Sequence, residues 1–247
     1  MLHGWGMNSA VWESVRPALE SRYCVSWIDL PGHGKNQHVV ANNMDEIVDL
    51  ILPHIPNNSH LLGWSLGGLV VQAIAERLSK NDTNNIKSMT LVASTPKFSQ
   101  ADDWHYAMSE DVLHTFSENL NQDIEDTLKR FVALQFMGIK DSKSIQRELI
   151  KAIEKWGGVL SNSSKKALNL GLELLIDSDF RSASHKIPMH WVLAERDRLI
   201  PKEVIKDLKY LRPDDQITLL ENAGHAPFMT HPEAFIASVT EFIENHA

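Results

Sequence analysis

Cysteine is the scarcest side chain in this sequence, and Cys24 is the only one among 247 residues. A single thiol excludes any disulfide within the chain and favours a reducing compartment. Cys24 lies in the apolar run from Tyr23 to Ile28, so we expect a buried structural thiol rather than a reactive one.

Long hydrophobic runs and a basic excess are also missing. No stretch approaches the roughly 18 uninterrupted apolar residues of a membrane helix, and the first residues lack the segments of a signal peptide. The formal net charge of −8 disfavours a general nucleic-acid binder. With 43% hydrophobic and 23% charged residues, the composition predicts a globular protein, which we expect to be a cytoplasmic monomer without membrane or nucleic-acid partners.

Strand-like and helix-like segments alternate in the first hundred residues and again near the end. The predicted strands are 23–28, 59–63, 88–93, 189–193 and 216–220, and the predicted helices are about 10–20, 44–52, 66–80 and 232–246. This alternation predicts an α/β fold, with a mostly parallel, doubly wound sheet and helices on both faces.

The segment from about 98 to 182 has helical patterns and almost no strand candidates. We interpret it as a helical cap inserted into the α/β core, which then comprises residues 1–97 and 183–247. No internal repeat or low-complexity segment interrupts this organisation.

The sequence "GWSLGG" at 63–68 links a predicted strand to a predicted helix. Its Gly63-Trp64-Ser65-Leu66-Gly67 has the form of a nucleophile elbow, in which a strained turn exposes the serine hydroxyl at the carboxyl edge of the sheet. Small residues at 63 and 67 fit the close approach of neighbouring backbone. Taken alone, the motif also fits an ordinary Ser/Gly turn before a helix.

A serine nucleophile needs a base, and the base needs an acid that orients it. His225 and Asp197 each follow a predicted strand, and the chain order Ser65, Asp197, His225 is the one expected for this arrangement. Glu195 competes with Asp197, which we prefer because it lies deeper in its loop. Two other acids, Asp177 and Asp179, fall at the exit of the cap and do not follow a core strand. The alternative base, His231, precedes a helix start, and we interpret it as a surface residue.

An acyl-transfer site also needs N–H donors for the developing oxyanion. The backbone N–H of Leu66, directly after the serine, is one candidate. The second is the N–H of Trp5 in "LHGWG" at 2–6, whose indole would also line the acyl pocket. This chemistry calls for no metal and no organic cofactor.

These segments together resemble the α/β-hydrolase family. The match spans nearly the whole chain: His3-Gly4, "DLPGHG" at 29–34, "GWSLGG", Asp197 and "GHAPF" at 224–228. The narrower features "LHGWGMNSAVW", "RFVALQFMG" at 130–138 and "AGHAPFMTHP" resemble the family of pimeloyl-[acyl-carrier protein] methyl ester esterases, the carboxylesterases of biotin synthesis.

The resemblance implies that Ser65, Asp197 and His225 form a catalytic triad. It also implies that the substrate contacts Trp5, Leu66 and the segment formed by Phe131, Val132, Ala133, Leu134 and Gln135. The expected reaction is hydrolysis of the methyl ester of pimeloyl-[acyl-carrier protein], with the carrier protein as partner. Members of the fold have strands before the His-Gly loop, whereas this sequence starts at Met1-Leu2-His3. We therefore expect either that the true start lies upstream or that the chain lacks core strands.

Basic residues are concentrated in the cap. Residues 129–166 contain nine basic residues and three acidic ones, although the whole chain is acidic. Lys143, Arg147, Lys151 and Lys155 recur every four residues and form a stripe on one helix face. This stripe is either a solvated helix face or a docking surface for the acidic carrier protein.

Two other functions remain open from the residues alone. A broad short-chain esterase would have the same triad without a preference for the carrier, and a ligand-binding protein would keep the fold with negligible turnover. Dehalogenases and epoxide hydrolases of this fold use an aspartate nucleophile, and Ser65 stands in that position here.

Overall fold

A four-stranded, wholly parallel sheet forms the centre of the computed structural model, which describes residues 1–80, 86–140, 142–155, 162–183 and 186–247. Its order is β1 (Ser59–Trp64), β2 (Ile86–Val92), β3 (Met189–Ala194) and β4 (Gln216–Leu220). The pairs are in register from Leu61↔Met89 to Ala194↔Leu220. The predicted strands 59–63, 88–93, 189–193 and 216–220 are therefore confirmed within two residues at each end.

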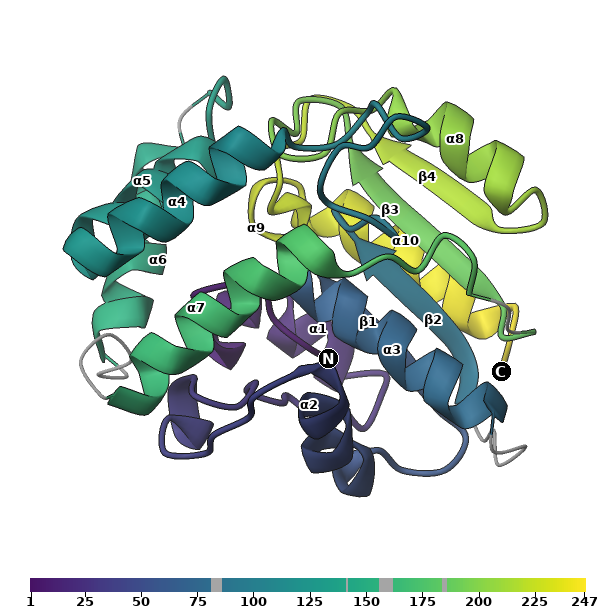
Figure 1. Cartoon of the computed structure of the whole chain (residues 1–247). Helices are drawn as coiled ribbons and strands as arrows, with labels where there is room; N and C mark the ends of the chain where they lie inside the picture. Colours follow the sequence, from purple (N-terminus) through teal and green to yellow (C-terminus); the bar gives the residue numbers. More distant parts are fainter. Residues whose placement is uncertain (81–85, 141, 156–161, 184–185) are drawn as a thin grey trace.

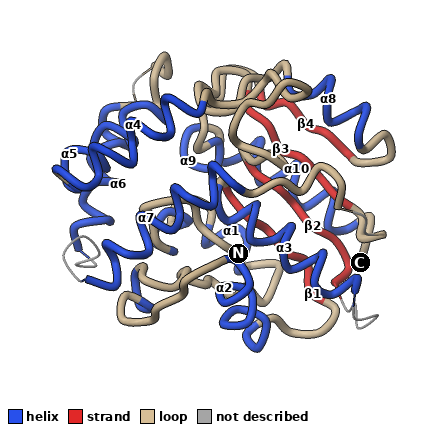
Figure 2. Tube along the Cα trace, in the orientation of Figure 1, coloured by secondary structure: helices blue, strands red, loops and turns tan. Residues whose placement is uncertain are grey.

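Helices cover both faces of this sheet, as expected of a doubly wound fold (Figures 1 and 2). Helix α3 (Leu66–Lys80) lies in front of β1 and β2 in Figure 1, and α10 (Pro232–Glu244) lies behind β3. The other helices outside the segment between β2 and β3 are α1 (Arg16–Glu20), α2 (Met44–Ile51), α8 (Val204–Leu211) and the short α9 (Pro227–Thr230).

Four consecutive helices between β2 and β3 lie above one end of the sheet (Figure 1). They are α4 (Glu110–Gln122), α5 (Ile124–Gln135), α6 (Lys143–Lys155) and α7 (Asn162–Asp177). Below, "cap helices" refers to these four. Asp123 directly precedes α5, and its carboxylate accepts a hydrogen bond from the N–H of Asp126 and caps the first turn.

The predicted strand 23–28 is wrong. Within the described residues, Ile28 alone forms a β-bridge, to Leu2, because only Met1 and Leu2 of the described chain pair with the backbone of this segment as a strand would. Without a ladder the segment stays open to solvent on one side. Cys24 is consequently exposed, which corrects the expectation of a buried thiol.

The predicted helix at about 10–20 is split into a 3₁₀ turn, Ser9–Trp12, and α1. Pro17 explains the break: it lacks an N–H and is tolerated only in the first turn of a helix, so α1 starts beside it. Pro53 has the same effect after α2, where the chain continues as the 3₁₀ turn Leu52–His54. The predicted helix at 66–80 is confirmed as α3, and residues 81–85 lie outside the described residues.

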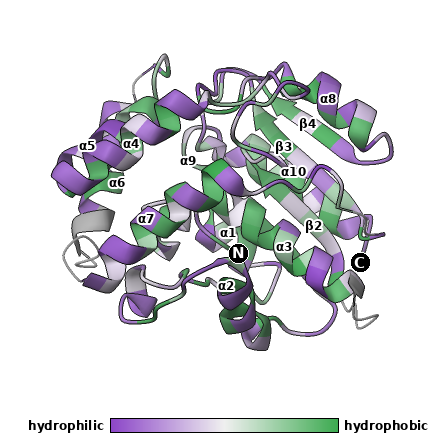
Figure 3. Ribbon diagram, viewed as in Figure 1, coloured by the Kyte–Doolittle hydropathy of each residue, from purple (hydrophilic) through white to green (hydrophobic). Residues whose placement is uncertain are grey.

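The hydrophobic core consists of apolar residues that are buried between the sheet and the helices on its two faces. All six residues of β3 are buried, as are the central residues of α3, and these segments appear green in Figure 3. Among the described residues, no helix has the length and apolar character needed to cross a membrane.

Two buried histidines make the stability of the folded protein depend on pH. Burial lowers the pKa of His3 to about 3, and burial, assisted by repulsion from His246, lowers the pKa of His190 to about 4. The His190 Nε2 atom pairs with the Thr218 hydroxyl at 2.9 Å, and its Nδ1 has no partner among the described residues. Both side chains are therefore neutral in the folded protein at pH 7.

We predict that stability falls as the pH drops from about 6.5 to 4. In this window His190 binds a proton in the unfolded chain, where its pKa is near 6.5, but not in the folded chain, where its pKa is about 4. The free energy of unfolding therefore falls by roughly 3 kcal/mol for such a group. Urea midpoints measured from pH 7.5 to 4.5 test this. The variant His190→Gln should show a shallower decline, and a decline parallel to that of the parent protein would contradict the assignment.

Candidate active site

Ser65 stands at the sharp turn between β1 and α3. Its φ of +54° lies in the left-handed region that non-glycine residues rarely adopt. The turn is fixed on both sides, because the Ser65 N–H donates to the Val92 carbonyl at 2.9 Å and its carbonyl accepts from the Gly68 N–H at 2.8 Å. This is the strained strand-to-helix geometry that a displayed nucleophile requires.

The glycines around Ser65 are dictated by backbone contacts. A Cβ at Gly63 would lie 2.2 Å from the carbonyl oxygen of Gly67, and a Cβ at Gly67 would lie 2.6 Å from the carbonyl oxygens of Leu2 and His3. Side chains at either position would push the start of α3 away from β1 and from the amino-terminal loop. The motif is therefore more than an ordinary Ser/Gly turn.

Ser94 is a residue of the site that sequence reasoning missed. Its hydroxyl donates to the Ser65 carbonyl at 3.0 Å, and a Cβ at Gly68 would lie 2.2 Å from that hydroxyl oxygen. Ser94 follows the end of β2 and the left-handed Ala93, with φ of +41°. A polar residue directly after a buried strand, in "LVASTP", was the available signal.

Asp197 and His225 are brought together at the carboxyl ends of β3 and β4. The His225 Nδ1 lies 2.8 Å from Asp197 Oδ2, and both side chains are almost completely buried. The other carboxylate oxygen of Asp197 accepts from the N–H groups of Leu199 and Ile200, at 2.8 and 3.1 Å. Asp197 is thus held rigidly and fixes which nitrogen of His225 carries the proton.

His225 Nε2 points into the interior without a hydrogen-bond partner among the described residues. Its backbone carbonyl accepts from the indole N–H of Trp64, the residue before Ser65, at 2.7 Å. The base and the serine turn are therefore joined directly, and the nitrogen opposite Asp197 is available to take a proton.

The competing residues face other partners. Glu195 pairs with Lys202 at 3.1 Å and accepts from the N–H of Asn222. Asp179 is bound by Arg181, and His231 pairs with the neighbouring Thr230 hydroxyl. Only Asp197 contacts His225 among the acids considered from the sequence.

The loop His3-Gly4-Trp5 lies beside the serine turn. His3 Nε2 accepts from the Leu30 N–H and Nδ1 faces the Gly4 carbonyl, both at 2.9 Å, so the neutral ring carries its proton on Nδ1. A Cβ at Gly4 would lie 3.2 Å from the Ser65 Cβ. His3 holds this loop in place, while the Leu66 N–H, first in α3, has no partner within the helix.

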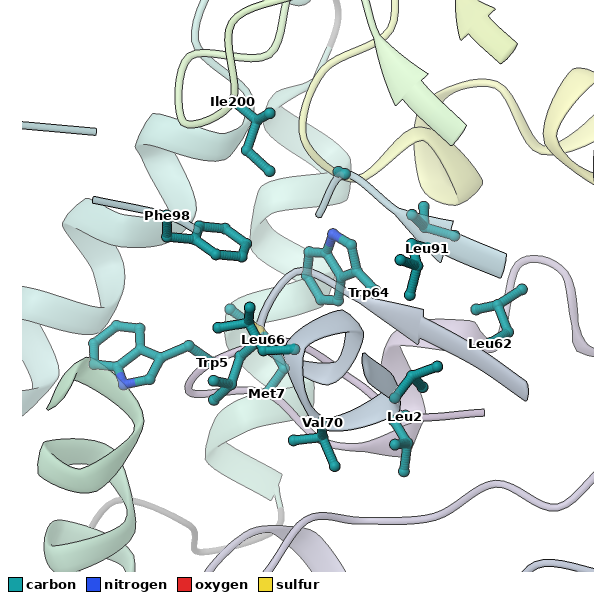
Figure 4. Packing of buried hydrophobic residues seen from close by; sticks show 14 of the residues in the cluster. Leu2, Trp5, Met7, Leu62, Trp64, Leu66, Val70, Leu91, Phe98 and Ile200 are labelled. Carbon is teal, nitrogen blue, oxygen red and sulfur yellow. The ribbon is translucent and has the colours of Figure 1, made fainter. Parts of the chain in front are cut away.

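Trp5 connects the loop to the cap helices. Its indole N–H donates to the Leu168 carbonyl in α7 at 2.8 Å, and its ring meets Phe131 of α5 edge-on, 4.8 Å between centroids. Figure 4 shows Leu66 and Phe98 beside Trp64, with the Trp5 ring on their other side. Gly171 is a second residue that the sequence reading missed, because a Cβ there would lie 2.5 Å from the indole.

Gln135 closes the site from the cap side. Its carbonyl accepts from the His225 N–H at 3.2 Å, and a Cβ at Gly224 would lie 2.9 Å from the same oxygen. The side-chain amide is buried, and neither its oxygen nor its nitrogen has a partner among the described residues. Of the segment named for substrate contact, Phe131, Val132 and Gln135 are buried, Leu134 is half-buried and Ala133 is exposed.

The basic residues of α6 lie on its outer face. Lys143, Arg147 and Lys151 are exposed, whereas Leu149 is buried. In the part of the chain that the structure describes, none of these three cations pairs with a carboxylate. The fourth member of the stripe, Lys155, ends α6, and its side chain lies outside the described residues.

No group of three or more metal-ligating side chains occurs within the described ranges. With a strained serine, an oriented histidine and a buried aspartate, this arrangement is suited to acyl transfer through a serine nucleophile.

Comparison with known proteins gives one family and one group of relatives. Residues 1–232 match the model of the alpha/beta hydrolase fold family. The chain is 34% identical over 246 residues to a pimeloyl-[acyl-carrier protein] methyl ester esterase of Pseudoalteromonas atlantica, covering 98% of this chain and 92% of the relative. A protein of the same name from Photobacterium profundum is 36% identical over 99% of this chain and 93% of the relative.

Solved structures agree on the fold. An esterase from Exiguobacterium antarcticum superposes with a TM-score of 0.84 at 20% identity, covering 98% of this chain and 91% of that one. A bromoperoxidase from Bacillus anthracis gives 0.83 at 22% identity, covering 98% and 90%. Likeness at this level of identity concerns the architecture alone.

We predict that a fluorophosphonate probe labels Ser65 and that Ser65→Ala abolishes labelling. Because Asp197 sets the proton on His225, Asp197→Asn should slow labelling by about a thousandfold or more. Glu195→Gln is the matched control, two residues away in the same loop, and should react like the parent protein. Mass spectrometry of the labelled peptide gives the position, and equal slowing by both variants would count against Asp197.

Proposed function

The chain belongs to the α/β-hydrolase family, and we propose that it is a serine carboxylesterase that hydrolyses the methyl ester of pimeloyl-[acyl-carrier protein] in biotin synthesis. The observation that carries the proposal is near-full-length identity of 34–36% to relatives of that name. The products are pimeloyl-[acyl-carrier protein] and methanol, and we expect the enzyme to act as a cytoplasmic monomer.

The proposed mechanism gives one role to each of Ser65, His225 and Asp197. His225 Nε2 takes the proton of the Ser65 hydroxyl while the oxygen attacks the ester carbonyl. The carbon–oxygen bond to the methoxy group then breaks, and methanol leaves with the proton that His225 returns. Water, deprotonated by the same nitrogen, attacks the acyl-serine and releases the acid and the free hydroxyl.

Charge develops at two places during this reaction. The oxyanion would be held by the N–H groups of Leu66 and Trp5, and the imidazolium of His225 by the Asp197 carboxylate. Both interactions occur in a nearly dry interior, since Ser65 and His225 are buried, and electrostatic stabilisation is larger there than in water. Substrate must reach these residues past the cap helices.

The apolar side chains beside the serine turn suit a hydrocarbon chain. Trp5, Leu66, Phe98 and Phe131 are all buried, and they come from the amino-terminal loop, α3, the β2–α4 connection and α5. Gln135 would supply the polar contact of the same pocket, because its side-chain amide is buried without a partner among the described residues and its backbone carbonyl accepts from the His225 N–H.

The outer face of α6 supports binding of the acidic carrier. Lys143, Arg147 and Lys151, which pair with no carboxylate among the described residues, present positive charge on an otherwise acidic protein. Lys129 and Arg130 of α5, in contrast, form ion pairs with Glu125 and Asp126. A local positive field raises the rate of encounter with an anionic partner even when net charges repel.

We predict that methyl-pimeloyl carrier protein is hydrolysed with a much higher kcat/KM than dimethyl pimelate. The triple variant Lys143→Glu, Arg147→Glu, Lys151→Glu should lose roughly tenfold to a hundredfold on the carrier substrate and nothing on the free ester.

The control for this experiment reverses the charge of two exposed lysines of α8 with Lys206→Glu and Lys209→Glu. This helix lies at the far end of the sheet from α6 (Figure 1). This control variant should retain its rate on both substrates. Equal rates of the parent protein on both esters would indicate a general esterase, and no turnover of either by a folded protein would indicate ligand binding.

We also predict opposite effects of Gln135→Leu on stability and activity. Removing a buried amide without partners should raise the melting temperature, and losing its contact with substrate should raise KM. Gln72→Leu is the matched control, because the amide of Gln72 donates to the Gly68 and Thr95 carbonyls and its loss should lower stability. A fall in the melting temperature of Gln135→Leu would contradict the assignment.

A further inference from the structure

The backbone carbonyl of Ser65 accepts two hydrogen bonds, and these come from different elements. The Gly68 N–H of α3 donates to it at 2.8 Å, and the hydroxyl of Ser94, which follows β2, donates to it at 3.0 Å. Both lone pairs of this oxygen are therefore used. The peptide unit that carries the Ser65 carbonyl also carries the N–H of Leu66, the proposed oxyanion donor.

This peptide unit is trans, because the described residues contain no cis peptide bond. In a planar trans peptide the C=O and the N–H point in opposite directions, so bonds that fix the Ser65 oxygen also fix the direction of the Leu66 N–H. The Leu66 N–H lies at the start of α3 and has no acceptor within the helix. Two donors on the oxygen side therefore determine where the N–H on the other side points.

Two features of the backbone place the Ser94 hydroxyl at this carbonyl. Ala93, directly before it, has the left-handed φ of +41°, and its N–H donates to the Val192 carbonyl of β3 at 2.8 Å. Gly68 leaves the room that the hydroxyl needs, because a Cβ there would lie 2.2 Å from the hydroxyl oxygen and 2.5 Å from the Ser94 Cβ. Since glycine is less favourable than alanine inside a helix, Gly68 destabilises α3 locally while it admits the hydroxyl.

The hydroxyl also changes the strength of the Leu66 N–H as a donor. A hydrogen bond accepted by a peptide oxygen polarises the amide, so the N–H of the same group donates more strongly. Ser94 is fully buried, and this effect is screened less there than in water. Orientation and polarisation of the N–H matter most when negative charge develops on the substrate oxygen, so they stabilise the transition state more than the bound substrate.

We propose that Ser94 is a positioning residue of the oxyanion site, whose hydroxyl orients and polarises the peptide between Ser65 and Leu66. The inference rests on the proposed function, in which Ser65 is the nucleophile. If Ser94 only filled a buried position, Ser94→Ala would lower stability alone. With the positioning role, Ser94→Ala lowers kcat and leaves KM unchanged, because the lost interaction acts in the transition state.

Ser99→Ala is the matched control for Ser94→Ala. Ser99 lies in the same connection after β2 and is also fully buried, and its hydroxyl donates to the Ile176 carbonyl of α7 at 2.7 Å. Each variant loses one buried hydroxyl that donates to a backbone carbonyl, so each should lower the melting temperature by about 2–4 °C. Only the Ser94 hydroxyl donates to the peptide unit of the serine turn, so the two variants separate a loss of stability from a loss of orientation.

Two probes measure the effect. Hydrolysis of p-nitrophenyl butyrate gives kcat and KM, and a trifluoromethyl ketone reports on the oxyanion site without turnover. The Ser65 oxygen adds to the ketone carbon, its proton passes to His225 Nε2, and the ketone oxygen becomes the oxyanion of the reversible adduct. The affinity for the ketone is measured as protection of Ser65 from a fluorophosphonate probe.

We expect Ser94→Ala to lower kcat roughly tenfold at unchanged KM and to weaken binding of the ketone by a similar factor, with Ser99→Ala close to the parent protein. The loss should be smaller than the roughly hundredfold or greater loss that follows removal of an oxyanion donor, because the Leu66 N–H remains. Equal kcat and equal ketone affinity in the two variants would overturn the role of Ser94, as would a change in KM alone.

The ketone experiment needs no carrier protein. A parent protein that binds the ketone but does not hydrolyse methyl-pimeloyl carrier protein would contradict the proposed function, and the two variants would still decide the role of Ser94. A folded parent protein that forms no adduct with the ketone would contradict both.

Discussion

The left-handed turn at Ser65 is the constraint on which the other parts of the structure depend. A strained φ persists only where surrounding contacts fix it, and here β2, the start of α3 and the amino-terminal loop all touch the turn. Gly67 lies against the carbonyls of Leu2 and His3, while the Ser94 hydroxyl holds the Ser65 carbonyl. The strand order, the glycines and the buried neutral His3 are therefore parts of one packing arrangement.

The interior above this turn leaves specific polar atoms unsatisfied. Nε2 of His225 and the amide of Gln135 are buried without partners among the described residues, whereas Asp197 has hydrogen bonds on both carboxylate oxygens. Buried polar groups are usually paired, and exceptions concentrate where a ligand or a reacting group completes them. The arrangement thus separates the firmly held Asp197 from the unpaired atoms of His225 and Gln135, which fit the roles proposed for them in binding substrate and transferring a proton.

Sequence patterns predicted the sheet and the serine, acid and base because these depend on local rules. Buried strands are continuous apolar runs, and the residues after them meet at one edge of the sheet. The failures concern long-range contacts. Residues 23–28 have a strand composition but only Met1 and Leu2 beside them, so Cys24 is exposed. Ser94 and Gly171 matter through contacts with Ser65 and Trp5. The place of Ser94 directly after a strand was a local signal, whereas no local pattern reveals the contact of Gly171 with the indole.

Gly171 illustrates what such a contact means over evolutionary time. A Cβ at this position would overlap the Trp5 indole, whose ring also packs edge-on against Phe131. Position 171 and position 5 therefore cannot vary independently: a larger residue in α7 is tolerated only with a smaller one in the amino-terminal loop. Among related sequences the two positions should covary, and each compensated pair would redistribute the room left for an acyl chain while leaving the strained serine turn unchanged.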